Sequence, residues 1–271
     1  MKTLPKLMLT LILVGAAALT ARAHTLRVLV TRPVTQLGMK NTAYLSYGHL
    51  LPLDEVIPAE EVGPYQVHGP DGAIRPLATA GKSVHAVDLA LDVPGMYQVA
   101  VTRLPITYVA YTEASGKQSF QRLPKDQAKL PEGAKLTFSA KSYQFSKAVV
   151  LHELANGAAT PTLGHPIEIL VDTLPGKNGY SADEPVRARV LFRGKPLAGV
   201  KVSAASTTRN PDGIPGVAGE TDAEGRVALD LVEPGTWVLD VLHVVESRPE
   251  DRAGFDNERF VATTAIPVTD K

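Results

Sequence analysis

Short apolar or alternating segments, separated by turns that contain Gly or Pro, recur along most of the chain. In the first part of the chain they lie at 25–31, 42–47, 83–91 and 96–103. In the last part they lie at 166–171, 186–192, 200–204, 226–231, 236–246 and 260–268. Alternation or apolar runs of this length between turn residues are typical of strands. The pattern therefore predicts an all-β protein, with a hairpin formed by 83–91 and 96–103.

The spacing of these strands predicts two Ig-like or transthyretin-like β-sandwich domains. We place the N-terminal β-sandwich at residues 24–110 and the C-terminal one at residues 164–271. Residues 111–163 are interpreted as a connector that carries extended strands. Gly and Pro are abundant and spread along the chain, and long helical periodicity is rare.

The first 23 residues have the pattern of a secretory signal peptide. Lys2 and Lys6 precede an apolar run at 7–19, and Ala21 and Ala23 form an A-x-A cleavage site. A transmembrane helix needs about 20 apolar residues, which is more than this run contains. We expect cleavage after Ala23, a periplasmic location and no membrane span in the mature form. The alternative is an uncleaved membrane anchor.

Cleavage at this position would make His24 the first residue of the mature protein. A free α-amine has a pKa of about 8 and loses its proton readily to a metal ion. The amine and the imidazole of one residue can then chelate a single ion, and imidazole suits Ni, Cu, Zn and Fe. The alternative is that His is first by chance.

Composition narrows the classes of partner. Three of the 28 basic residues (Lys2, Lys6 and Arg22) and no acidic residue lie in the leader, which leaves the mature chain with 25 basic and 28 acidic residues. This balance argues against a nucleic acid partner. The sequence contains no Cys, so neither a disulfide framework nor a thiol nucleophile is available.

Several segments of the second half carry a family resemblance. They are LGHPIEI at 163–169, VLFRGKPLAGVKV at 190–202, TDAEGR at 221–226 and PGTW at 234–237. In this order the chain resembles the NikM-like family of exported proteins, strongly over 145–268 and less over 24–110. Members of that family commonly carry Ala-His at the junction between signal peptide and mature chain, as Ala23 and His24 do here. The resemblance implies a periplasmic component of nickel/cobalt uptake, or a domain of unknown function.

Three further residues join His24 as candidate metal ligands. His165 lies between a Gly and a Pro at a strand start, and Glu168 follows three positions later as a ligand or as an acceptor that orients an imidazole. His49 follows Gly48 at a strand end, where loops often build sites. The alternative for both His residues is a turn without a ligand.

The other ionisable residues favour structural roles. His85 and His243 share faces with apolar residues and are interpreted as core or rim positions, whereas His68 is expected to face solvent. His152 is a minor candidate. The acidic pair Asp54 and Glu55 is interpreted as part of a solvated loop, with local enrichment of cations as the alternative.

Three hypotheses for function follow. The first is an exported protein that captures a divalent transition metal, Ni or Co with Cu or Zn as alternatives, and passes it to a membrane metal transporter. The second is a metal-free Ig-like interaction or adhesion module of the cell envelope. The third, ranked last, is a copper enzyme that uses the N-terminal His. The sequence contains no GxSxG, P-loop or HExxH motif, and we expect that the protein is not an enzyme.

Overall fold

The structure, a computed structural model, describes residues 24–79, 84–154 and 157–270. Strands dominate these residues, and the only helical turns among them are η1 (Ala59–Glu61) and η2 (Pro249–Asp251). The prediction of an all-β fold is therefore confirmed. The predicted signal peptide, residues 1–23, lies outside the described residues. In the part that is described, no helix is long and apolar enough to cross a membrane.

A large central sheet contains strands from both halves of the chain. Its order is β15 (Val217–Glu220), β14 (Lys201–Ser206), β17 (Gly235–Glu246), β18 (Asn257–Thr269), β9 (Lys135–His152), β7 (Gly95–Thr112), β4 (Val62–His68) and β5 (Ile74–Pro76). Three short strands extend it: β11 (Tyr180–Ser181) on β18, β2 (Val34–Thr35) on β9 and β8 (Gln118–Gln121) on β7.

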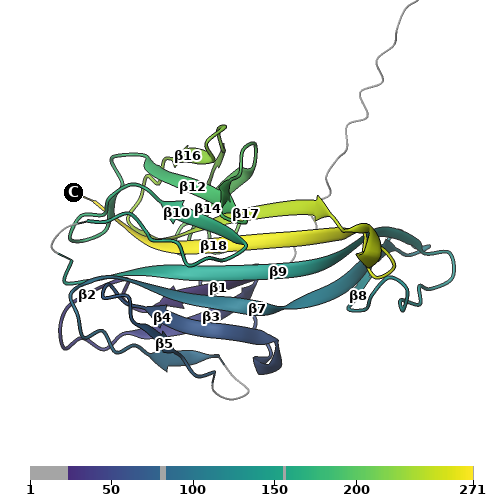
Figure 1. Cartoon of the computed structure of the whole chain (residues 1–271), viewed down its shortest axis with the longest axis horizontal. Helices are drawn as coiled ribbons and strands as arrows, with labels where there is room; N and C mark the ends of the chain where they lie inside the picture. The colour runs from purple at the N-terminus through teal and green to yellow at the C-terminus, as the bar shows by residue number, and fades with distance from the viewer. Residues whose placement is uncertain (1–23, 80–83, 155–156, 271) are drawn as a thin grey trace, which may run out of the picture.

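Two smaller sheets cover the central sheet. One is formed by β1 (Thr25–Val30), β3 (Thr42–Gly48) and β6 (Ala86–Asp88). The other is formed by β10 (Ile167–Val171), β12 (Val186–Phe192), β13 (Lys195–Pro196) and β16 (Arg226–Leu229). Figure 1 shows β10 and β12 on one side of β9 and β18, and β1 and β3 on the other side.

Each face of the central sheet has its own hydrophobic core. On β9, Val149 and Leu151 pack with β10, β12 and β16 in what we call the C-terminal core. Ala148 and Val150 pack with β1 and β3 in what we call the N-terminal core. Successive strand side chains point to opposite faces, so one apolar run serves both cores.

The two predicted sandwiches thus share their middle layer. Residues 111–163, interpreted as a connector, contain β9, which pairs with β7 of the first half and with β18 of the second half. The pairing with β18 is parallel and runs from Asn257 opposite Ala140 to Ala265 opposite Ala148. The division into separate domains at 110 and 164 stays a prediction.

The predicted hairpin of 83–91 and 96–103 is wrong. The described part of the first segment forms β6, which pairs with β3 in a covering sheet, whereas the second segment lies in β7 of the central sheet. The turn before β7 therefore carries the chain from one layer to another. Local turn residues predict a reversal, but they do not determine which sheet each flanking strand joins.

A substitution in one core tests whether the shared sheet makes the two halves one folding unit. Val150 is fully buried in the N-terminal core, and the single Trp, Trp237, lies in the C-terminal core. We expect Val150→Ala to lower the free energy of unfolding by about 2 kcal/mol, through lost burial and a residual cavity. The urea midpoint of Trp237 fluorescence should move together with that of tyrosine near-UV circular dichroism. The exposed Val232 supplies a control, Val232→Ala. A fluorescence transition that does not move would show that the cores unfold independently.

Candidate functional site

His24 and His49 meet at one corner of the sheet formed by β1 and β3. The two strands are antiparallel, with Thr25 opposite Gly48, so the residue before β1 lies beside the residue after β3. The two imidazole rings have their centroids 4.6 Å apart, at an interplanar angle of 52°. Two of the four predicted ligands therefore lie close together, although they are 25 positions apart in the sequence.

The main chain of His24 is fixed by a side chain of the central sheet. Gln144 of β9 accepts a hydrogen bond from the Leu26 N–H (2.8 Å) and donates one to the His24 carbonyl (3.0 Å). Two residues further along each strand, Ser146 of β9 accepts a hydrogen bond from the Val28 N–H at 2.8 Å. Buried polar groups of a sheet need partners, and here the backbone of β1 supplies them. The position of His24 thus follows from the docking of β1.

The His24 ring stacks on Tyr47 of β3. Their centroids are 5.3 Å apart at an interplanar angle of 29°. The Arg103 guanidinium lies 4.8 Å from the Tyr47 ring centroid and donates through Nε to Glu61 at 3.0 Å. Arg103 is almost fully buried, so this ion pair forms a rigid support behind the aromatic ring. Sequence reasoning did not single out Tyr47.

Glu55 contacts the imidazole ring of His24. Its Oε1 lies 2.9 Å from His24 Nε2. Backbone hydrogen bonds in both directions between Tyr47 and Glu55, of 2.8 and 3.3 Å, fold the loop back onto β3. From the sequence, Glu55 is expected to be part of a solvated loop. Its carboxylate is exposed, but it also has a specific partner in the site.

Asp54 organises the turn that carries His49. One carboxylate oxygen, Oδ2, accepts from the N–H groups of His49 (2.6 Å) and Leu50 (3.0 Å). These two hydrogen bonds lower the pKa of Asp54 below its usual value, and the bond from Leu50 has the larger effect. Gly48 has a φ of +120°, and a Cβ there would lie 2.4 Å from the same oxygen. The close approach of Asp54 thus requires Gly48.

A loop of the second half supports the same turn. The Leu51 N–H donates to the Pro211 carbonyl at 2.8 Å. Gly213 has a φ of +66°, and a Cβ on it would lie 2.0 Å from the His49 carbonyl oxygen. The turn after β3 is therefore packed between its own Asp54 and the segment around Gly213.

His165 and Glu168 lie on the opposite face of the central sheet. Gln144 faces β1, whereas Lys147, three positions later on β9, faces β10, since side chains alternate along a strand. Lys147 donates to Glu168 Oε1 at 3.4 Å, and both side chains are almost fully buried. The His165 ring packs against Phe145 at 5.1 Å between centroids. The four predicted ligands therefore do not form one site.

The carboxylate of Glu168 already has protein partners. Besides Lys147, it accepts from the N–H groups of Leu163 (2.9 Å) and Gly164 (3.1 Å). Burial lowers the pKa of Lys147, and Glu168 opposes that shift. An ammonium group beside the carboxylate disfavours a second cation there. The arrangement is that of a buried ion pair that anchors the segment before β10.

The remaining histidines have structural surroundings. His85 is buried with Nε2 at 2.8 Å from the Ile57 carbonyl. His243 is half-buried, with its ring 4.7 Å from that of Phe192. His152 is buried, and Tyr97 packs against it at 6.3 Å between ring centroids. His68, expected to face solvent, is half-buried, and its pKa is lowered by burial and by Lys147.

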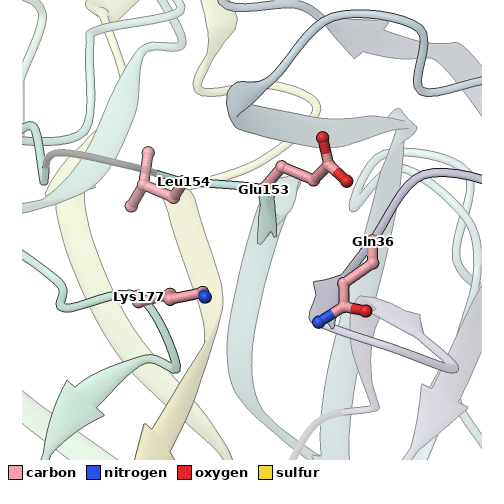
Figure 2. A pocket seen from close by; sticks show the side chains of 4 residues that line it. All are labelled: Gln36, Glu153, Leu154 and Lys177. Atoms are coloured by element: carbon pink, nitrogen blue, oxygen red, sulfur yellow. The ribbon is translucent and has the colours of Figure 1, made fainter.

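A shallow pocket lies at the far end of β9. It has a volume of about 320 Å³ and is lined by Gln36, Glu153, Leu154 and Lys177. Figure 2 shows the Glu153 carboxylate, the Gln36 amide and the Lys177 ammonium around it. The Glu153 carboxylate accepts from the Leu37 N–H at 3.0 Å. None of the predicted ligands lines this pocket.

Side chains alone do not complete a metal site. Across residues 24–79, 84–154 and 157–270, no group of three or more His, Asp or Glu side chains is placed to hold an ion. His24 and His49 supply two nitrogen donors of the kind that transition metals bind. If the predicted cleavage before His24 takes place, the new α-amine would add a third nitrogen donor.

The fold and the site define an all-β protein of three stacked sheets, with two histidines at the corner where its first described strand begins. Residues 21–245 match the model of the family described as a domain of unknown function, DUF4198, and the chain belongs to that family. A search of curated proteins found no match. The finer resemblance to NikM-like proteins stays a prediction.

The support of His49 by Gly213 can be tested with a pair of glycine variants. Gly213→Ala should cost more than about 1 kcal/mol of stability, because Ala at positive φ is strained and its Cβ would collide with the His49 carbonyl. Gly116 also has a positive φ, but nothing lies within 4 Å of its ideal Cβ. Gly116→Ala thus carries the backbone strain without the collision. Equal losses of unfolding free energy in urea would contradict the contact.

The buried surroundings of His165 predict an acid-dependent loss of stability. Burial lowers the pKa of His165 to about 4, below the value of 6.5 that it has without the fold. The unfolded chain therefore binds this proton first, and stability falls as the pH drops from about 6.5 towards about 4. His165→Gln should reduce that loss, measured as the difference in unfolding free energy between pH 7 and pH 4.5. An unchanged difference would contradict the assignment.

Proposed function

We propose that the mature protein is an exported metal-binding protein that holds a divalent transition metal at His24. The proposed donors are the α-amine and imidazole of His24 and the imidazole of His49. The observation that carries this proposal is the 4.6 Å separation of the two ring centroids at the point where the predicted mature chain begins. Both histidines lie in backbone segments that are fixed by hydrogen bonds, which limits the movement of their rings.

Cleavage of the leader is required for this chemistry. In the precursor the nitrogen of His24 belongs to a peptide bond, and its lone pair is delocalised into the carbonyl. A free α-amine releases its proton readily and is then a nitrogen donor. The proposed site would therefore form only after export, which limits metal capture to the periplasm.

The surroundings of the proposed site are suitable for a cation. The Glu55 carboxylate lies beside the His24 imidazole, and the Asp54 carboxylate accepts from the backbone N–H of His49. The His24 side chain is about one-third exposed. An exposed ion that is held by three protein donors would have other coordination positions, at which ligands can exchange. We propose that the protein serves as an accessory to nickel or cobalt uptake and passes the ion to a membrane transporter, without catalysing a reaction. Cu(II) and Zn(II) would also bind such donors, because affinity follows the metal series as much as the site.

Calorimetric titration of Ni(II) and Cu(II) tests this proposal. One sample is the chain that begins at His24, confirmed by intact mass. The second is the same chain acetylated at its α-amine, which keeps every side chain and removes one donor. We expect acetylation to weaken binding by more than about 100-fold, beyond the scale that changes outside the ligand set produce.

A third sample, His49→Ala, tests the second imidazole and should also bind more weakly than the unmodified chain. The thermal transition of each sample shows whether it remains folded. Equal affinity of the acetylated and free chains would exclude the α-amine as a ligand. No binding by any sample would contradict metal capture and favour a metal-free Ig-like interaction module.

A further inference from the structure

The contact between Glu55 and His24 determines which ring nitrogen is available. Glu55 Oε1 lies 2.9 Å from His24 Nε2. An ionised carboxylate only accepts hydrogen bonds, so the neutral ring must carry its proton on Nε2 to make this contact. The lone pair of the imidazole is then on Nδ1.

Nδ1 is also the ring nitrogen that the proposed chelate requires. The α-amine, Cα, Cβ, Cγ, Nδ1 and the ion would form a six-membered ring. Nε2 lies on the far side of the imidazole and cannot close a ring of that size with its own α-amine. The tautomer that Glu55 selects is thus the one that allows both donors of His24 to bind one ion.

The Glu55 carboxylate is held in place by its own backbone. Antiparallel backbone hydrogen bonds of 2.8 and 3.3 Å hold Glu55 opposite Tyr47. Tyr47 is also the residue on which the His24 ring stacks. The preceding residue, Asp54, is anchored by the N–H groups of His49 and Leu50. The loop therefore presents Glu55 to Nε2 and also holds the backbone of His49 in place.

We propose that Glu55 is a positioning residue for the metal site, an inference that rests on the proposed function. Glu55 holds the His24 imidazole in the Nε2–H tautomer, orients the ring on Tyr47 and makes Nδ1 a stronger donor. Metal-ligating histidines generally donate their second N–H to a carboxylate or carbonyl, and loss of that partner weakens metal binding about 10- to 100-fold. Glu55 acts through His24 and does not touch the ion.

The first test needs no metal. Long-range proton–nitrogen NMR spectra report which ring nitrogen of each histidine carries the proton, at a pH well above the ordinary histidine pKa of about 6.5. In the chain that begins at His24, we expect the His24 ring to be in the Nε2–H form. In Glu55→Gln the ring should become a mixture of tautomers, because an amide no longer requires a donor. Glu60 is an exposed acid of the same loop, and Glu60→Gln, with the same change of charge, should leave the spectrum unchanged.

The second test is calorimetric titration of Cu(II) into the same three proteins. Glu55→Gln should bind about 10- to 100-fold more weakly than the parent chain, and Glu60→Gln should match the parent chain. A weaker affinity together with a changed tautomer supports the positioning role. A weaker affinity with an unchanged tautomer would identify Glu55 as a direct ligand and overturn the inference, as would a His24 ring in the Nδ1–H form.

The two proposals can fail separately. If acetylation of the α-amine leaves Cu(II) affinity unchanged, the proposed metal site fails, whatever Glu55 does. If acetylation weakens binding but Glu55→Gln matches the parent chain in both measurements, the metal site stands and the role of Glu55 is contradicted. Thermal transitions of the two Gln variants show that each comparison is made between folded proteins.

Discussion

The alternation of side chains along β9 is the constraint on which the rest of the structure depends. Phe145, Val149 and Leu151 pack in the C-terminal core, and Ala148 and Val150 pack in the N-terminal core. A strand that is apolar on both faces must be covered on both faces, because exposure of either would leave a large hydrophobic surface in water. The two covering sheets satisfy that requirement, and they do so with chain from opposite ends of the sequence. The apolar side chains on both faces of β9 therefore account for the arrangement in three layers.

The polar residues of the central sheet then determine the position of β1, and with it that of His24. Gln144, Ser146 and Thr263 are buried on the face that β1 covers, and all three bond to β1 backbone or to each other. Burial of such groups without partners is costly, and a shift of β1 by one residue would lose these bonds. The location of His24 thus follows from backbone pairing and does not depend on its imidazole. The backbone of a site at the start of β1 is therefore held in place by the same hydrogen bonds that hold the strand.

The sequence was sufficient to predict most strands and the all-β class, because alternation and turn residues are local signals. The metal-binding roles of His24 and His49 stay predictions. The sequence was not sufficient to predict that β9 is shared, since pairing with β7 and β18 depends on contacts far apart in the chain. Whether His165 lies near His24 could not be predicted for the same reason: the face on which each side chain lies is fixed by sheet register. Glu55 was missed as a partner because a carboxylate in a Pro-rich loop has no periodic signal. Its role becomes visible only when the backbone pairing with Tyr47 places it beside Nε2.

The corner that holds the two histidines depends on both halves of the chain, although its residues come from the first. His24 is held by Gln144 of the shared strand, and the turn after His49 rests on Pro211 and Gly213 of a loop in the second half. A single β-sandwich built from the first half would lack both supports. Rigid placement of donor atoms lowers the reorganisation that an ion must drive when it binds. The central sheet that joins both halves therefore holds two histidines distant in sequence close together, and this closeness is what the proposed metal site requires.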